Sequence, residues 1–183
     1  MRKRLTWLVL FSAAIAVTAL YHASNVLATP AQEFVGTTLA LGRFGDIDVF
    51  NHFLPPNLPN LREDEEERHK RGIWLSWQKT KGLSDVYVQT NVWQPRGSTG
   101  WHSHPGHSLI IVTAGTVSDY EGDDPDCKPH VYTQGMGFVD RGGDHAHIIR
   151  NEGDVVAATV AVQLIPAGQP RRIDVADPGN CHF

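Results

Sequence analysis

GWHSHPGHSLIIVTAG, residues 100–115, joins a cluster of histidines to an apolar run that ends at a glycine. Successive side chains of a β-strand point to opposite faces. His102 and His104 would therefore share one face if this segment is extended. A pair of histidines on one strand is weak evidence of a site, because exposed pairs are common, so the rest of the chain has to supply the second half of the argument.

A second stretch, residues 137–153, reads GFVDRGGDHAHIIRNEG and repeats the spacing at His145 and His147. Two such strands facing one barrel interior would direct several imidazoles at one point. Neutral imidazole is a common metal ligand and suits zinc, copper, iron and nickel. The sequence therefore predicts a metal site built from these side chains: His102, His104, His145 and His147.

The segments from residue 73 onward are short, rich in Val, Tyr and Trp, and separated by clusters of Gly, Pro, Asp and Asn. Many short strands with little helix indicate an all-β sandwich or barrel. Alternation along two of these strands gives the expected core residues, which are Leu109, Ile111, Val160, Val162 and Leu164.

The two histidine stretches resemble the two motifs of the cupin superfamily, G-x5-H-x-H-x3/4-E-x6-G and G-x5-P-x-G-x2-H-x3-N, over about residues 97–153. The resemblance implies a single-domain jelly-roll β-barrel. In cupins, both histidines and the glutamate of the first motif, with the histidine of the second, usually hold a divalent metal ion. The same resemblance allows a homodimer.

Two departures from the motifs affect the expected ligand set. The glutamate position falls on Ser108, which is a poor metal ligand. For the second motif, the spacing from Gly142 favours His145 and the spacing to Asn151 favours His147. We prefer His145, and participation of both would give four imidazoles in compensation for the missing carboxylate.

The N-terminus has the anatomy of a secretory signal peptide. Three basic residues at positions 2–4 precede an apolar run to about Leu20, and Val26-Leu27-Ala28 fits a cleavage site. The alternative is an uncleaved membrane anchor. The predicted organisation is a signal peptide at 1–28, an extended lead-in with a charged insertion at 29–72, and a barrel at 73–183. The expected location is periplasmic or secreted.

The chain has two cysteines, Cys127 and Cys181. Export would place them in an oxidising compartment, where disulfide pairing is the usual outcome. The alternative is a pair of free or metal-binding thiols. A disulfide would tie the C-terminal tail to a loop in the middle of the barrel.

Composition and charge narrow the function. A net charge of −4 gives no reason to expect a nucleic-acid partner, which needs a concentrated basic face. The first hypothesis is a metal-dependent dioxygenase acting on a small organic substrate, with a redox-active ion such as Fe, Mn, Ni or Cu. The second is a non-catalytic module that binds a small ligand or a metal, Zn included. No catalytic residue can be named, and no membrane contact is expected after signal removal.

Overall fold

The computed structural model describes residues 28–53 and 72–183, and all regular elements within these ranges are β-strands. The predicted charged run, and the signal peptide up to residue 27, lie outside the described residues. The expectation of an all-β fold is confirmed. The strands are β1 (Gln32–Phe44), β2 (Ile47–Phe53), β3 (Trp74–Thr80), β4 (Ser84–Ser98), β5 (His102–His104), β6 (Ser108–Ala114), β7 (Thr116–Glu121), β8 (His130–Thr133), β9 (Gly137–Asp140), β10 (Gly143–Arg150), β11 (Ala157–Pro166) and β12 (Ile173–Asp174).

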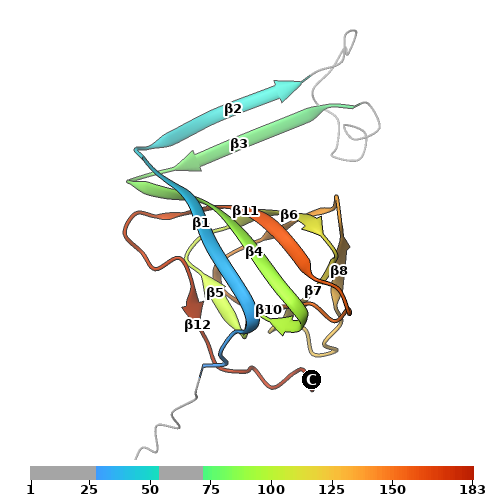
Figure 1. Ribbon diagram of the computed structural model, residues 1–183. Helices are drawn as coiled ribbons and strands as arrows, with labels where there is room; N and C mark the ends of the chain where they lie inside the picture. Colours follow the sequence, from blue (N-terminus) through green and yellow to red (C-terminus); the bar gives the residue numbers. More distant parts are fainter. Residues whose placement is uncertain (1–27, 54–71) are drawn as a thin grey trace, which may run out of the picture.

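The strands form a nearly closed barrel with a hairpin projecting from it (Figure 1). One side has the order β1-β4-β11-β6-β9, and the other has the order β12-β5-β10-β7-β8. Arg150 of β10 pairs with Ser98 of β4 and joins the two sides. Among the described strands, β2 and β3 pair only with each other and make the hairpin. No helix in the described part of the chain could cross a membrane.

Strand β1 lies in the segment that was expected to be an extended lead-in, and it is an integral strand of the barrel sheet. It pairs antiparallel with β4 from the Gln32–Ser98 pair to the Phe44–Ser84 pair. An ion pair reinforces this pairing, because Arg43 on β1 holds the buried carboxylate of Asp85 on β4 at 2.7 Å. The sheet therefore begins well before residue 73.

The side chains that were expected to form the core point out of the barrel instead of into it. Leu109 and Ile111 are each 55% exposed, whereas Ile110 and Val112 between and beside them are buried. On β11 the buried set is likewise the opposite phase, since it includes Ala161. The interior of the barrel is filled partly by polar side chains, so the more apolar phase of these strands lies on the outside. Period-2 alternation cannot identify the inner face when both faces carry apolar residues.

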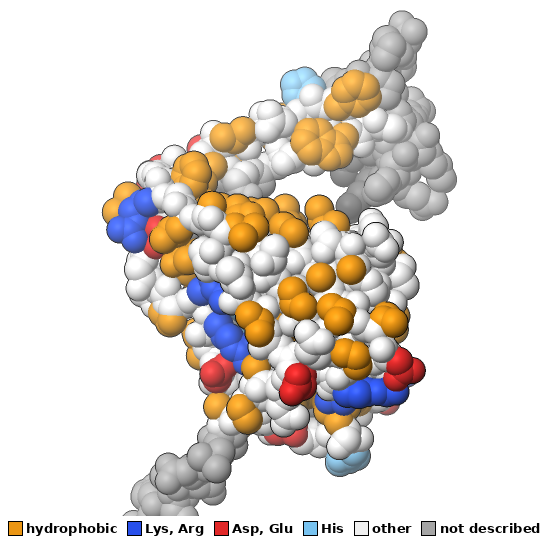
Figure 2. Space-filling view, viewed as in Figure 1, with side chains coloured by type: hydrophobic (Ala, Val, Ile, Leu, Met, Phe, Trp, Pro, Cys, Tyr) orange, Lys and Arg blue, Asp and Glu red, His pale blue; other side chains and the backbone are white. Residues whose placement is uncertain are grey.

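The outer face of β9, β6 and β11 presents a continuous row of apolar side chains, because Val139 pairs with Leu109 and Leu109 with Val162. Orange side chains spread over the visible face of the barrel and over the hairpin in Figure 2. Exposed apolar patches of this kind often serve as interaction surfaces. The homodimer expected from the sequence stays a prediction.

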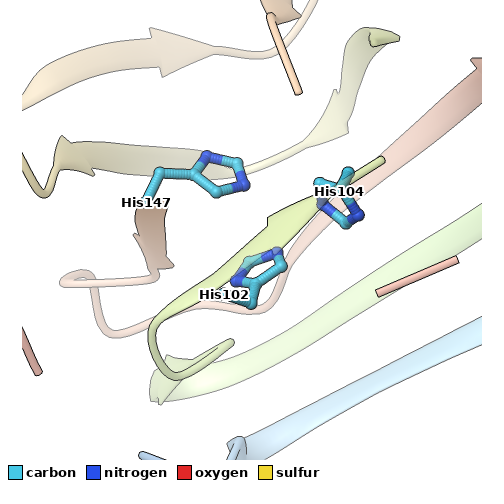
Figure 3. A group of neighbouring side chains, drawn as sticks. All are labelled: His102, His104 and His147. Atoms are coloured by element: carbon cyan, nitrogen blue, oxygen red, sulfur yellow. The ribbon is translucent and has the colours of Figure 1, made fainter. Parts of the chain in front are cut away.

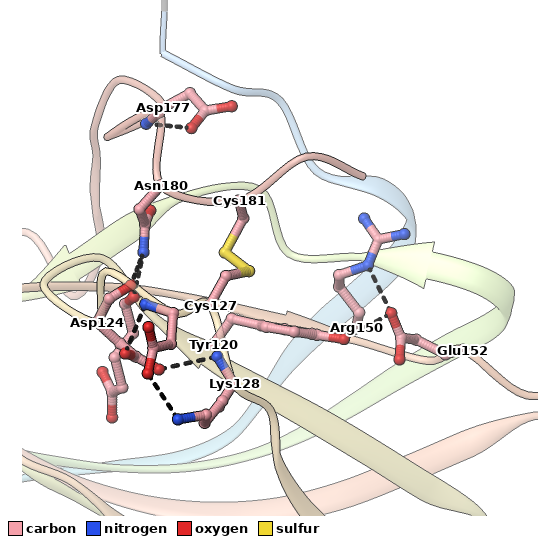
Figure 4. The surroundings of a disulfide bond; sticks show 12 residues. Tyr120, Asp124, Cys127, Lys128, Arg150, Glu152, Asp177, Asn180 and Cys181 are labelled. Carbon is pink, nitrogen blue, oxygen red and sulfur yellow. Dashed lines mark hydrogen bonds and ion pairs between the residues drawn. A yellow bond between two sulfur atoms is a disulfide. The ribbon is translucent and has the colours of Figure 1, made fainter.

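The C-terminal tail covers the other side of the barrel. Trp101, Tyr120, Ile148 and Cys181 form a second buried cluster beneath it. The predicted disulfide between Cys127 and Cys181 is present and fastens the tail over this cluster (Figure 4). The tail therefore packs against the side of the barrel that contains β5 and β10.

We expect Ile110→Ala to lower the free energy of unfolding by roughly 2–5 kcal/mol, because it opens a cavity in the barrel interior. Its neighbour gives the matched control, since Ile111→Ala removes the same atoms from the outer face and should change stability by less than about 0.5 kcal/mol. Urea unfolding of the two variants measures the difference. Equal losses, or a larger loss at Ile111, would contradict this assignment of faces.

Replacing both cysteines by serine should lower the free energy of unfolding by about 4 kcal/mol, because the disulfide closes a loop with a sequence separation of 54 residues and restricts the unfolded chain. Denaturant titration of the double variant against the oxidised protein tests this, with circular dichroism as a control for the native fold. A loss below about 1 kcal/mol would show that the loop model does not describe this crosslink.

Candidate metal centre

Three histidines from two adjacent strands meet inside the barrel. His102 and His104 lie on β5, and His147 on β10 is the direct cross-strand partner of His102. The ring centroids are 4.5 Å apart for His102 and His147, 4.8 Å for His102 and His104, and 5.7 Å for His104 and His147. One nitrogen of each ring lies within 4.8 Å of the others, so the group could hold a metal ion (Figure 3).

The Nδ1 atom of each ring is held by an oxygen. His102 Nδ1 is 2.9 Å from the carbonyl of Gly100, and His104 Nδ1 is 2.7 Å from that of Arg171. His147 Nδ1 is 3.1 Å from Oδ1 of Asp119. A carbonyl or carboxylate oxygen can only accept, so each Nδ1 carries the proton and donates it. Every Nε2 is left with a free lone pair, which is the arrangement that orients histidine ligands around metal ions.

His147 supplies a further sign of a missing ligand. Its side chain is buried, and Nε2 has no hydrogen-bond partner among the described residues. An unsatisfied buried polar atom costs on the order of 1–3 kcal/mol, so native proteins rarely leave one without a reason. A metal ion shared with the other two rings would satisfy this nitrogen. The residues present therefore fit a divalent transition metal.

Burial keeps two of the histidines neutral. It drives the pKa of His102 well below its ordinary value, and charge on His147 and Arg172 pushes it further in the same direction. Burial also lowers the pKa of His104, although the carboxylate of Asp140 opposes the shift. Only the neutral form offers a lone pair to a metal, so both side chains are prepared for ligation without first losing a proton.

His147 behaves differently because of Asp119. Burial lowers the pKa of His147, but the hydrogen bond to Asp119 and the negative charges of Asp119, Asp140 and Glu121 outweigh it, and the net shift is upward. A carboxylate behind a histidine raises the basicity of the opposite nitrogen. The same basicity strengthens Nε2 of His147 as a ligand for a metal ion.

The turn before β5 shapes the site through its backbone. Gly100 has a φ of +68°, and a Cβ at this position would collide with the carbonyl oxygen of Thr29. Only glycine fits both conditions without strain. The same residue offers the carbonyl that holds His102, so this glycine fixes the orientation of one imidazole.

The histidines line a small cavity of about 40 Å³. Its wall is mixed, with apolar side chains such as Trp93 and Ile110 beside polar ones such as Gln89 and Asn91. Arg171 and Arg172 contribute to the lining from the loop before β12. Two more buried polar atoms near the cavity lack partners among the described residues, namely Oε1 of Gln89 and Nε1 of Trp93. The cavity wall thus offers hydrogen-bonding groups that no described residue uses.

His145, which the sequence led us to prefer over His147, lies outside this group. Its ring contacts the carboxylate of Glu121, and its Nδ1 is 3.6 Å from Asp123. A register shift in the pairing of β10 with β5 falls between Gly143 and His147 and interrupts the simple alternation on which the preference rested. The structure brings together His102, His104 and His147, and it places His145 in a separate, more exposed cluster.

Sequence reasoning missed the groups that support the histidines. Asp119 and Asp140 are both buried beside the rings, and neither was singled out. The available signal was an aspartate inside each of two otherwise β-forming runs, at the end of β9 and within β7. A buried carboxylate costs free energy unless it is paired, so an aspartate at such a position indicates a nearby hydrogen-bond donor or cation.

No protein-family model matches the chain, and the comparison with curated proteins finds no match. Solved structures with some likeness include Peruvianin-I, a cysteine peptidase from Thevetia peruviana latex (24% identity, TM-score 0.41), and oxalate oxidase in complex with glycolate (23%, 0.42). They cover 50% and 49% of this chain, which spans 56% and 46% of theirs, about half of their length. A cupin superfamily protein from Desulfitobacterium hafniense has 14% identity and a TM-score of 0.38, with 44% of this chain and 67% of that chain covered.

At these scores the likenesses carry no argument about activity, and the fold rests on the strand arrangement itself. The two sides of one antiparallel sheet close on one another, and the His-x-His strand β5 pairs with the histidine strand β10. The fold is a nearly closed all-β barrel. In this barrel His102, His104 and His147 lie together, and Ser108 stands where the motif has a glutamate.

Metal-free protein should lose stability in mild acid through His102. Because its folded-state pKa lies far below the unfolded value, the unfolded chain takes up a proton below about pH 6.5 and the folded protein does not. Between about pH 7.5 and pH 5.5 the free energy of unfolding of the wild type should fall by about 1 kcal/mol more than that of His102→Asn. Denaturant titrations at both pH values measure this, and parallel curves for the two proteins would contradict a buried neutral His102.

Proposed function

We propose that the protein binds one divalent transition-metal ion through the Nε2 atoms of His102, His104 and His147, and that it is a metal-dependent oxygenase acting on a small organic substrate. The candidate ions are Fe, Mn, Ni, Cu and Zn, of which the redox-active ones suit oxygenase chemistry. A three-histidine set would leave coordination positions free for other molecules.

One observation carries the proposal. Three buried rings donate Nδ1–H to fixed oxygens, and their opposite nitrogens come together where the structure offers His147 Nε2 no partner. A cluster of structural histidines would be expected to use both ring nitrogens, because each unsatisfied one has a cost. The committed Nδ1 atoms and free Nε2 atoms are instead what metal ligation requires.

When bound, the ion would supply Lewis acidity and, for Fe, Mn, Ni or Cu, a redox centre. The chain's own residues would do the rest. The carbonyls of Gly100 and Arg171 and the carboxylate of Asp119 keep the three rings oriented. The apolar part of the wall, including Trp93 and Ile110, limits water around the reacting molecule.

The cavity favours a small, oxygen-rich substrate. The Nε1–H of Trp93, which has no partner among the described residues, can donate to a substrate oxygen. Arg171 and Arg172 both line the cavity, and the guanidinium of Arg172 is paired with the carboxylate of Asp174. Burial and the neighbouring Arg172 lower the pKa of Arg171, which is the expected effect of a cation held in a partly dry site beside another cation. An anionic substrate would relieve that repulsion.

A non-catalytic binding module is the second candidate. It is favoured by the fact that both carboxylates next to the histidines are already engaged, Asp119 with His147 and Asp140 with Ser108. Neither is free to act as a general acid or base in the geometry described. Purified protein that retains a small ligand but consumes no oxygen with any candidate substrate would favour this reading.

Export to the periplasm or the exterior remains part of the proposal. The disulfide between Cys127 and Cys181 is compatible with an oxidising compartment. The N-terminal pattern of the sequence gives the other support. Small molecules are the proposed partners, rather than nucleic acid.

We expect His102→Ala and His147→Ala to reduce bound metal from about one ion per chain to less than about 0.1, because two nitrogen ligands cannot replace three in an affinity that rests on the full set. His145→Ala is the matched control on the same strand and should retain the wild-type content. Elemental analysis of purified proteins and calorimetric titration of metal-free proteins provide the measurement.

The opposite pattern, with metal lost from His145→Ala and retained in the other two variants, would move the site to the cluster around Glu121. A wild-type protein that takes up no divalent ion would remove the basis for the proposal.

A further inference from the structure

Asp140, the last residue of β9, presents a carboxylate to His104 of the histidine cluster. Its side chain is only 1% exposed, so it is desolvated as completely as the histidines. Three groups contact it: the backbone N–H of Gly142 donates to Oδ1 at 2.9 Å, the hydroxyl of Ser108 donates to Oδ2 at 3.2 Å, and Nε2 of His104 lies 3.4 Å from Oδ2.

The contact with His104 joins two acceptors. His104 Nδ1 donates to the carbonyl of Arg171, so the ring presents Nε2, the nitrogen without that proton, to Asp140. Nε2 therefore points a lone pair at a carboxylate oxygen. Two lone pairs facing each other in a buried site repel, unless a cation lies where both can reach it.

The turn after β9 determines which oxygen is available. Gly142 has a φ of +65°, and a Cβ at this position would collide with the carbonyl oxygen of Gly106. This close approach of two turns holds the N–H of Gly142 against Oδ1. The other oxygen, Oδ2, is the one directed at His104.

The position of Asp140 matches the departure in the sequence. Ser108, at the place of the motif glutamate, is the direct cross-strand partner of Asp140 in the pairing of β6 with β9. Side chains of such a pair lie on the same face of the sheet about 5 Å apart. A carboxylate absent at position 108 is thus present on the neighbouring strand, and the hydroxyl of Ser108 orients it.

We propose that Asp140 is the anionic ligand of the metal centre and takes the part of the carboxylate missing at Ser108. The inference rests on the proposed metal binding by the three histidines and adds to it a ligand of different chemistry. The ligand set would then be three imidazoles and one carboxylate, which lowers the net charge of a divalent site from +2 to +1. Carboxylate oxygen favours harder ions such as Mn²⁺ over Cu²⁺ relative to imidazole alone.

Asp140→Asn separates this role from a structural one. The amide keeps an oxygen for Gly142 and turns an N–H toward Nε2 of His104, so the repulsion in the metal-free protein becomes a hydrogen bond. We expect metal-free Asp140→Asn to have a Tm equal to or above that of the wild type, while its affinity for Mn²⁺ falls at least about 100-fold. A purely structural aspartate would give the reverse, a lower Tm with unchanged affinity.

Two further variants complete the experiment, with calorimetric titration of Mn²⁺ and Cu²⁺ into metal-free protein as the readout. Asp123→Asn, at the exposed carboxylate beside His145, is the control and should match the wild type for both ions. Combining Ser108→Glu with Asp140→Ser returns the carboxylate to the motif position, and it should restore most of the Mn²⁺ affinity that Asp140→Ser alone loses.

Wild-type affinity for both ions in Asp140→Asn would overturn the inference while leaving the three-histidine site intact. Equal losses for Mn²⁺ and Cu²⁺, with no recovery in the Ser108→Glu combination, would also overturn it. Failure of the wild type to bind either ion would remove the proposed function and the inference together, so the two failures are distinguishable.

Discussion

The hydrogen bonds at the Nδ1 atoms of His102, His104 and His147 are the constraint on which the rest of the site depends. Each bond fixes a tautomer and a ring plane at once, because the partner oxygen can only accept. The three oxygens come from separate parts of the chain, the turn before β5, the loop before β12 and strand β7. The three rings can come together only if all three parts of the chain are correctly placed, so the geometry of the site depends on the whole fold.

Two apolar clusters and hydrogen bonds between buried side chains offset the cost of placing polar groups inside the barrel. A cluster around Trp93, Val112 and Val117 fills one part of the interior, and the tail fastened by the disulfide protects a second cluster behind β5 and β10. Between them, buried amides are bonded in sequence, with Gln89 donating to Asn91 and Asn91 donating to Thr159. These bonds lower the cost of burying polar side chains and give the cavity a defined shape.

Much of this could be predicted from the sequence, because the signals were local. Short runs with period-2 patterning gave the all-β class, and the spacing of His102 and His104 placed both on one face. The phase of the strands could not be predicted, since Leu109 and Ile110 are equally apolar and only the assembled sheet determines which one is enclosed. The choice between His145 and His147 could not be predicted either, because it depends on a register shift between β10 and β5 that no residue in the sequence indicates. Asp140 escaped notice because its relation to Ser108 exists only across a pair of strands.

Diffraction from crystals of the metal-loaded protein, with the ion located by its anomalous signal, tests the central claim most directly. The account predicts one strong peak inside the barrel, about 2.0–2.2 Å from the Nε2 atoms of His102, His104 and His147. A peak held instead by Glu121, Asp123 and His145, with the three inner rings turned away from any ion, would contradict it.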